Sequence, residues 1–243
     1  MSSQRDPGPF LKSEFIPEKR IQRIVLEQLQ ATKLLPATPS PVAVDKFSDR
    51  KWGMAEDYEN LPDDVLGCAM FTINGIDRIV INSKLDEDTS LTGRQRVRST
   101  IAHEIGHAIL HEKMFIEKMM FDRNQRLLFG ELDRNTQPPT RERIVCREPD
   151  VFGGKGKSPW WEIQANKFMA EMLMPRPLFL QVVEPLLANY EFEEFRSINR
   201  FFQRERAIGA VSKTFNVSNQ MAKIAVENYL RQVRPKTEEG ALL

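Results

Sequence analysis

Residues 99–112 read STIAHEIGHAILHE and contain all three histidines of the 243-residue chain. His103 and His107 are four positions apart, so on an α-helix they lie one turn apart on one face and can reach the same metal ion. Glu104 lies about 100° around the helix from His103, where a carboxylate can act on a water molecule instead of binding the metal. The HExxH spacing therefore predicts a helix over about 95–113 that carries two zinc ligands and a general base.

An isolated HExxH also arises by chance on surface helices. Here the flanking residues, RSTIAHEIGHAIL, are apolar and indicate a partly buried helix. His111 continues the four-residue spacing, but along an unbroken helix its backbone lies about 12 Å from that of His103. We therefore expect His111 to end the helix, where the helix dipole favours it, with at most an auxiliary contact to a ligand.

The segment WWEIQANKFMAEMLMP (160–175) supplies the candidates for a third ligand. A catalytic zinc takes three protein ligands, and the two cysteines of the chain form no zinc-binding motif. Glu162 precedes Asn166 by about one turn, so Glu162 can bind the metal while Asn166 hydrogen-bonds a histidine ligand and fixes its tautomer. An amphipathic core helix with a solvated Glu162 explains the same pattern, and Glu171 is a competing carboxylate.

The two segments together resemble the ImmA/IrrE family of metallopeptidases, in which HExxH is followed by a helix of the type ExxANxFAxxLLMP. LPDDVLGCAMFTINGIDRIVINSKL and RQRVRSTIAHE resemble the strand pair and basic lead-in of that family, so the likeness covers about residues 40–180. It implies a zincin-like α+β fold with one Zn²⁺ per chain, bound by His103, His107 and Glu162. Glu104 would be the general base that activates a zinc-bound water, although a His₂Glu set is not strictly selective for zinc.

Apolar segments upstream of the histidines indicate a small sheet. PVAVDKF (41–47), VLGCAMFTI (65–73) and RIVIN (78–82) are typical of strands, with a hairpin turn at Asn74-Gly75. A helix is expected before them over 16–35. Zinc peptidases of this type hold an extended substrate against a sheet edge, and we expect 65–73 or 78–82 to be that edge.

These patterns divide the chain into four regions. They are a flexible arm (1–16), a metallopeptidase domain (17–180), a helical C-terminal part (181–234) and a polar tail (235–243). Within the domain, 114–160 reads as a long inserted loop region around a short strand candidate, RIVCR, which contains Cys146. A buried strand cysteine is the favoured interpretation of Cys146, and an inhibitory fourth zinc ligand is the alternative.

The segment AIGAVSKTFNVSNQMAKIAVENYLRQV (207–233) has a helix-turn-helix pattern. One helix would end at Phe215, Asn216 would take the left-handed turn position, and Ser218 would cap the next helix. Residues 195–236 contain nine Lys or Arg against two Glu, a local balance of +7, which suits DNA binding. We favour a structural helix pair without DNA contact, because peptidases related to the family often end in such a pair.

Composition limits the partners and the location. The net charge is +1, with 41% hydrophobic and 28% charged residues, which is typical of a soluble globular protein with no overall bias toward nucleic acid or membrane. The N-terminus lacks a signal-peptide pattern, and no run of 18 apolar residues occurs. We therefore expect a cytoplasmic protein without membrane contact.

Peptide hydrolysis also needs a donor for the oxyanion, and Tyr58, Arg98 and Arg176 are the candidates. Our first hypothesis is a zinc endopeptidase; the resemblance implies cleavage of a DNA-binding repressor in a bacterial or mobile-element regulatory circuit. The alternative is a non-catalytic regulatory protein that binds DNA or a repressor through its C-terminal helices, with a structural metal. The intact Glu104 favours the first, because a structural zinc needs no general base.

Overall fold

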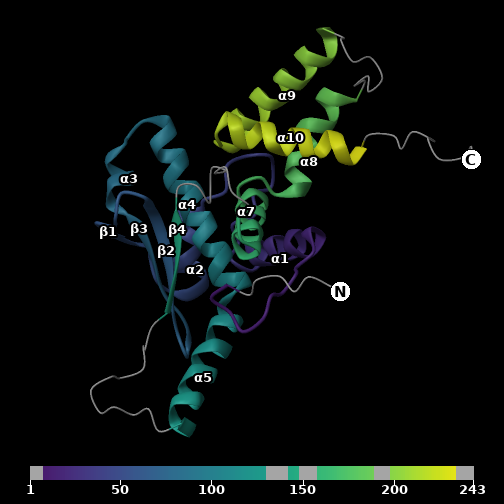
Figure 1. Ribbon diagram of the computed structural model, residues 1–243. Coiled ribbons are helices and arrows are strands. Elements are labelled where there is room, and N and C mark those ends of the chain that lie inside the picture. The colour runs from purple at the N-terminus through teal and green to yellow at the C-terminus, as the bar shows by residue number, and fades with distance from the viewer. Residues whose placement is uncertain (1–7, 130–141, 148–157, 189–197, 234–243) are drawn as a thin grey trace, which may run out of the picture. The chain divides into compact units, whose positions relative to one another are not determined.

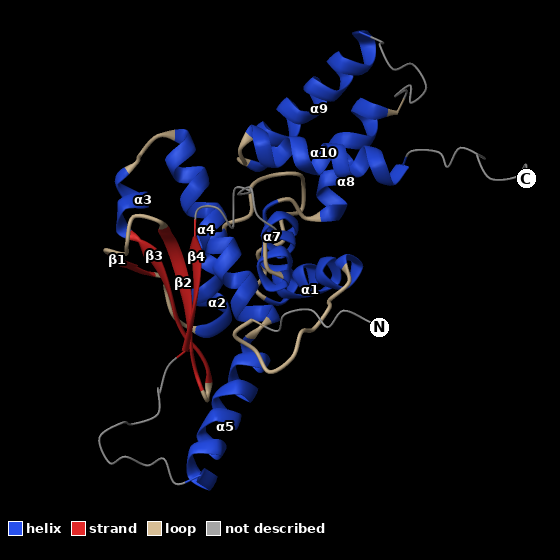
Figure 2. Ribbon diagram, in the orientation of Figure 1, coloured by secondary structure: helices blue, strands red, loops and turns tan. Residues whose placement is uncertain are grey.

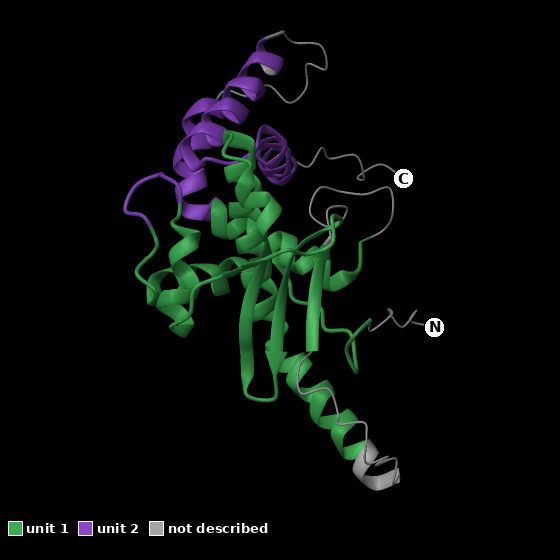
Figure 3. Cartoon of the chain, turned by 90° about the vertical axis from the view of Figure 1, so that its left-hand side faces the viewer, with its two compact units in different colours: residues 1–35, 42–173 green, residues 36–41, 174–243 purple. Residues whose placement is uncertain are grey.

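A computed structural model describes residues 8–129, 142–147, 158–188 and 198–233 (Figure 1). The chain forms two compact units (Figure 3). Unit 1 comprises Met1–Leu35 and Val42–Leu173, and unit 2 comprises Pro36–Pro41 and Met174–Leu243. Helices and a small mixed sheet make this an α+β protein (Figure 2). In the part of the chain described, no helix is both long and apolar enough to cross a membrane.

The sheet and most of the helices belong to unit 1. Its helices are α1 (Glu18–Ala31), α2 (Phe47–Trp52), α3 (Ser83–Glu87), α4 (Leu91–Leu110), α5 (Glu112–Phe129) and α7 (Trp160–Leu173), with a 3₁₀ turn η1 (Val44–Lys46). Its strands are β1 (Asp57–Glu59), β2 (Val65–Thr72), β3 (Gly75–Asn82) and β4 (Glu142–Arg147). Unit 2 contains α8 (Arg176–Leu187), α9 (Ile198–Phe215) and α10 (Asn219–Val233).

The four strands lie in the order β1-β3-β2-β4. β2 runs antiparallel to both β3 and β4, whereas β1 runs parallel to β3. The expected hairpin is confirmed, but its two turn residues are Ile73 and Asn74 instead of Asn74 and Gly75. Thr72 pairs with Gly75, which begins β3 and has a φ of 118° that glycine adopts without strain. The prediction that 65–73 is a sheet edge is wrong, because β2 lies between β3 and β4. The same prediction for 78–82 is wrong over Val80–Asn82, which pair with the short strand β1.

Helix α4 lies between the sheet and α7 (Figures 1 and 2). It is therefore buried around most of its circumference from Ser99 to Ala108, and Ile101, Ala102 and Ile105 are almost fully buried. Its first residue, Leu91, comes earlier than the expected position 95, because the Ser90 hydroxyl caps the helix by accepting the backbone N–H of Gly93 at 3.0 Å. It ends at Leu110 instead of about 113.

Two expectations about secondary structure are wrong. Within 114–160, the predicted loop begins as a helix, α5, whose Met114, Phe115 and Met119 are buried in a cluster with Phe71 of β2. Charged residues separate these apolar positions, so the sequence of α5 shows only a weak amphipathic pattern. The helix therefore depends on packing in this cluster. The strand candidate is β4, and 130–141 and 148–157 lie outside the described residues.

The expected strand 41–47 is also absent from the described structure, which has η1 and the start of α2 there. Val42, Val44 and Phe47 are fully buried. The alternation of 42 and 44 resembles a strand, but Val44 and Phe47 are three residues apart and line one face of a helical turn equally well.

The N-terminal arm is packed where it is described. Phe10 is 4% exposed, and its ring lies edge-on to Phe115 with centroids 4.8 Å apart. Further along, the backbone carbonyl of Glu14 accepts a hydrogen bond from the side chain of Gln164 in α7. An aromatic side chain and a backbone hydrogen bond thus attach the described part of the arm, 8–16, to unit 1.

Unit 2 begins at Met174, earlier than the expected boundary at 180, because Pro175 separates α7 from α8 and α8 packs against α9. The expected turn is confirmed between α9 and α10. Phe215 ends α9, Asn216 has a φ of 51°, and the Ser218 hydroxyl accepts the backbone N–H of Met221 at 3.2 Å.

Candidate metal centre

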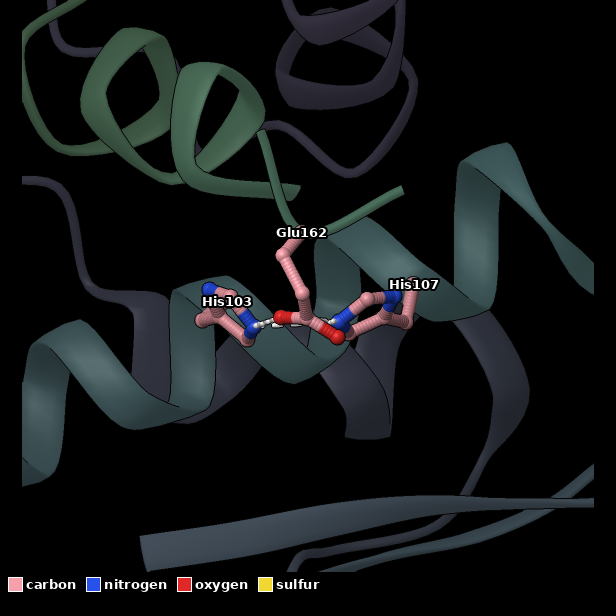
Figure 4. A group of neighbouring side chains, drawn as sticks. All are labelled: His103, His107 and Glu162. Carbon is pink, nitrogen blue, oxygen red and sulfur yellow. Dashed lines mark hydrogen bonds and ion pairs between the residues drawn. The ribbon is translucent and has the colours of Figure 1, made fainter. Parts of the chain in front are cut away.

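Three buried side chains from two helices meet at one point in unit 1 (Figure 4). His103 Nε2 lies 3.0 Å from His107 Nε2 and 3.1 Å from Glu162 Oε2, and His107 Nε2 lies 3.4 Å from the same oxygen. The side chains of both histidines are fully buried, and that of Glu162 is 4% exposed. The structure thus brings together the two HExxH histidines and the carboxylate that was expected to join them.

The chemistry of this triangle fits a divalent cation. Ligand atoms about 2.0–2.1 Å from a tetrahedral zinc lie about 3.3–3.4 Å from one another, close to the separations seen here. A proton can bridge only one side of a triangle of electron-pair donors, whereas a cation satisfies all three. Imidazole nitrogens and a carboxylate suit zinc but also other transition metals, so the three side chains could hold a metal ion without determining which one.

A close crossing of α4 and α7 positions the three ligands. Gly106 makes it feasible: a Cβ added there would lie 3.2 Å from the carbonyl oxygen of Ala165 and 3.2 Å from Cβ of Phe168. Glu162 lies in the first turn of α7, where the partial positive charge of the helix N-terminus favours a carboxylate. The crossing therefore places the first turn of α7, which carries Glu162, over the face of α4 that carries His103 and His107.

Each histidine ligand has a hydrogen-bonding partner on its second nitrogen. His103 Nδ1 lies 3.0 Å from Asn166 Oδ1, and since an amide oxygen only accepts, His103 carries its proton on Nδ1 and leaves Nε2 free for a metal. His107 Nδ1 lies 3.0 Å from His111 Nδ1. On its other side, His111 Nε2 lies 3.1 Å from Oε1 of Gln164.

His111 therefore makes the auxiliary contact that its spacing allowed. The expectation that His111 ends the helix is confirmed, because His111 is the C-cap residue of α4. Burial and the adjacent His107 lower the pKa of His111 to about 3, which disfavours the charged form that a helix dipole would stabilise. The contribution of Gln164 was missed in the sequence. The one signal for it is that Gln164 is a polar residue amid the apolar positions of α7.

Burial and mutual proximity set the charges of the ligands. Burial lowers the pKa of His107, and the adjacent Glu162 opposes the decrease. Burial alone would raise the pKa of Glu162, but the adjacent imidazoles of His107 and His103 outweigh it and hold this pKa below its ordinary value. A neutral imidazole and an ionised carboxylate are the forms that bind metal.

Glu104 is fully buried beside the ligand cluster but is not part of the triangle. Burial, and then the charge of Glu162, raise its pKa well above the ordinary value; weaker interactions with Cys146 and the Ala69 backbone oppose the rise. Neither carboxylate oxygen has a hydrogen-bond partner of good geometry among the described residues. A buried carboxylate without a strong partner is unusual in a structural role, and it is well suited to exchange protons with a reactant.

The sheet lies directly against Glu104. A Cβ added to Gly67 of β2 would lie 3.3 Å from Cγ of Glu104, so glycine is needed for the close approach of α4. Cys146 is a fully buried cysteine in β4, as favoured from the sequence. Its Sγ, a nitrogen of His103 and a carboxylate oxygen of Glu104 all lie within 4.8 Å of one another, so β4 passes beside the site.

The other candidate residues are not joined to the cluster by any hydrogen bond or ion pair among the described residues. Tyr58 lies in β1 and is 46% exposed. Arg98 lies in α4 with a half-buried side chain, and burial lowers its pKa. Arg176 belongs to unit 2 and hydrogen-bonds Gln232 there. The competing carboxylate, Glu171, instead accepts a hydrogen bond from Gln22 of α1 at 2.8 Å.

Comparison with known proteins adds no assignment: no protein-family model matches the chain, and neither does any curated protein.

Proposed function

We propose that the chain is a metal-dependent hydrolase, and specifically a zinc endopeptidase. The observation that carries the proposal is the triangle of His103 Nε2, His107 Nε2 and Glu162 Oε2, with sides of 3.0, 3.1 and 3.4 Å. Three protein ligands, leaving a fourth position for a reactant, are typical of catalytic zinc, whereas structural zinc takes four.

When bound, the ion supplies Lewis-acid chemistry, because it lowers the pKa of water and polarises a carbonyl oxygen. Glu104 then takes a proton from the attacking water and returns it to the leaving amine. Asn166 holds the His103 ring in the tautomer that presents Nε2 to the metal.

The substrate in this proposal is an extended peptide that binds along β4. β4 ends the sheet as described and passes beside Glu104 through Cys146. A terminal strand offers backbone groups to a further strand. Since the ligands and Glu104 are buried, the substrate reaches them only after local opening of the packing over the site.

The resemblance to ImmA/IrrE peptidases leads us to propose a DNA-binding repressor as the natural substrate. A second candidate function has one observation in its favour, the α9–α10 helix pair with its left-handed Asn216 and capping Ser218. In that alternative the chain acts by binding DNA or a repressor, and its metal is structural.

Metal content and peptide hydrolysis test the proposal together. We expect about one zinc per chain in the wild type and in Glu104→Gln, and little in Glu162→Gln. Glu171→Gln is the matched control on the same helix, and it should retain zinc because Glu171 contacts Gln22 instead. With a quenched-fluorescence peptide library as probe, Glu104→Gln should lose roughly 10²–10⁴-fold in rate.

Zinc in the wild type without hydrolysis of the library or of a co-expressed repressor would favour the binding function. Salt-dependent binding of the full chain to duplex DNA would support the same alternative. Equal zinc in all four proteins would show that Glu162 is not a ligand.

A further inference from the structure

Three hydrogen bonds lead from His107 away from the proposed metal and end on the N-terminal arm. His107 Nδ1 lies 3.0 Å from His111 Nδ1, and His111 Nε2 lies 3.1 Å from Gln164 Oε1. Gln164 Nε2 then donates to the backbone carbonyl of Glu14 at 2.7 Å. Both imidazoles are fully buried and Gln164 is 4% exposed, so water does not compete for these groups.

The last acceptor determines the direction of every bond in the series. A backbone carbonyl can only accept, so the amide group of Gln164 must point its NH₂ at Glu14 and its oxygen at His111. That oxygen also only accepts, so His111 carries its proton on Nε2. In a neutral imidazole the other nitrogen is an acceptor, and His111 Nδ1 therefore accepts the Nδ1 proton of His107.

We propose that Gln164, His111 and the carbonyl of Glu14 are positioning groups that fix the tautomer and the ring orientation of His107. The series leaves the Nε2 lone pair of His107 directed at His103 and Glu162. The inference rests on the proposed metal site, and it adds residues to which the HExxH pattern gives no role. It also explains why a third histidine lies one turn after the second.

The two ligand histidines differ in how they are held. His103 donates directly to Asn166, which lies on α7 one turn after Glu162. His107 instead donates to His111, whose ring is enclosed by Phe10 and Trp160 at centroid distances of 5.7 and 5.9 Å. The N-terminal arm thus contributes both a carbonyl and an aromatic wall to the support of the second ligand.

Nitrogen-15 NMR of the histidine rings tests the inference without any activity measurement. Only three rings contribute signals, and His111→Gln identifies the signals of His111 by their loss. We expect His103 and His107 as Nδ1–H tautomers and His111 as the opposite, Nε2–H tautomer. An Nδ1–H or doubly protonated His111 in the wild-type protein at neutral pH would overturn the inference.

Zinc affinity of the full chain, measured by competition with a chelator, supplies the second test. Gln164→Leu and His111→Leu should each weaken zinc binding about 10–100-fold, the usual effect of losing a partner of a ligand. His111→Gln should restore much of the affinity, because its amide can accept from His107 and donate to Gln164. Gln22→Leu is the control, since it removes a glutamine hydrogen bond to Glu171 of the same helix.

The outcomes separate this inference from the proposed function. If the wild type binds no zinc, the proposed function fails, while the ring spectra still decide the tautomers. If the wild type binds zinc and Gln164→Leu binds it equally well, the positioning role is refuted and the metal site stands. If Gln164→Leu does not fold, the wild-type ring spectra alone decide.

Discussion

Gly106 of α4 lies against Ala165 of α7 so closely that a Cβ on Gly106 would be 3.2 Å from the Ala165 carbonyl oxygen and 3.3 Å from its Cα. Both contacts are with backbone, which cannot rotate away as a side chain can. The pair therefore sets the separation of the two helices that carry the proposed metal ligands.

Gly106→Ala should destabilise the protein. Overpacking typically costs about 1–3 kcal/mol, and the better helix propensity of alanine recovers about 1 kcal/mol, so we expect a net loss of about 1 kcal/mol and weaker zinc binding. Urea denaturation and chelator competition measure the two effects. Gly209→Ala in α9 is the control, because no atom lies within 4 Å of its added Cβ; it should gain about 0.5–1 kcal/mol. An equal increase in the free energy of unfolding for Gly106→Ala and Gly209→Ala would contradict the close crossing of α4 and α7.

The stability of the metal-free protein should depend on pH in opposite ways through Glu104 and Glu162. The pKa of Glu104 is raised on folding, so its contribution is full below the ordinary glutamate pKa of about 4.3 and is lost as the pH rises toward the higher folded value. Glu104→Gln removes that loss and should be more stable than wild type at pH 7, by about 1.4 kcal/mol for each unit of the shift.

Glu162→Gln should do the reverse. The pKa of Glu162 is lowered on folding, so its stabilisation is present above about pH 4.3 and is lost as the pH falls through the folded value. This variant should be less stable than wild type at pH 7, with a difference that shrinks in acid. Urea denaturation of chelator-treated proteins checks both signs, from pH 4 to pH 8 for Glu104→Gln and from about pH 5 downward into acid for Glu162→Gln. A pH-independent offset of either variant across its own range would contradict the assigned shift.

Phe10→Ala should be strongly destabilising, although Phe10 lies near the N-terminus. Phe10 packs against Phe115, His111 and Trp160, and truncation of a buried phenylalanine typically costs about 3–5 kcal/mol. Phe15→Ala is the matched control, because that side chain is 68% exposed and its truncation should cost under about 0.5 kcal/mol. Similar thermal midpoints for the two variants would show that the arm is not packed in solution.

Both thiols should resist modification in the native protein. Cys68 and Cys146 are buried, and burial followed by the charge of Glu104 raises the pKa of Cys68 to about 11. We expect no reaction with Ellman's reagent at pH 7–8 before unfolding, and two thiols after it. Cys68→Ala leaves Cys146 as the sole thiol beside Glu104, so its reaction rate reports opening of the site. Prompt reaction of Cys146 in the folded protein would contradict a closed resting state.

Much of the candidate site follows from helical spacing. His103 and His107 share a face because they are four residues apart, and Glu162 and Asn166 share a face for the same reason. What spacing cannot supply is the register of one helix against another. The choice of Glu162 over Glu171 depended on the resemblance, and in the structure it follows from the contact at Gly106, which puts the first turn of α7 over the histidines.

The sequence predictions were wrong or incomplete for elements that have no strong local pattern. The helix α5 mixes methionines with charged residues and gains its apolar face only by packing on Phe71. Residues 42–47 fit a strand and a helical turn equally well by local pattern. The arm carries one aromatic residue, Phe10, whose burial depends on rings from α5 and α7.

The sequence by itself determined that two imidazoles and a carboxylate share one helix, that an ExxxN pair lies on another, and that a hairpin joins β2 to β3. These are short-range relations, set by 3.6 residues per turn and by glycine's access to positive φ. Only the tertiary structure decided which carboxylate completes the triangle, which strands end the sheet, and that His111 is neutral and hydrogen-bonded to Gln164. These depend on contacts between residues far apart in the chain, which burial and close packing select and local periodicity does not record.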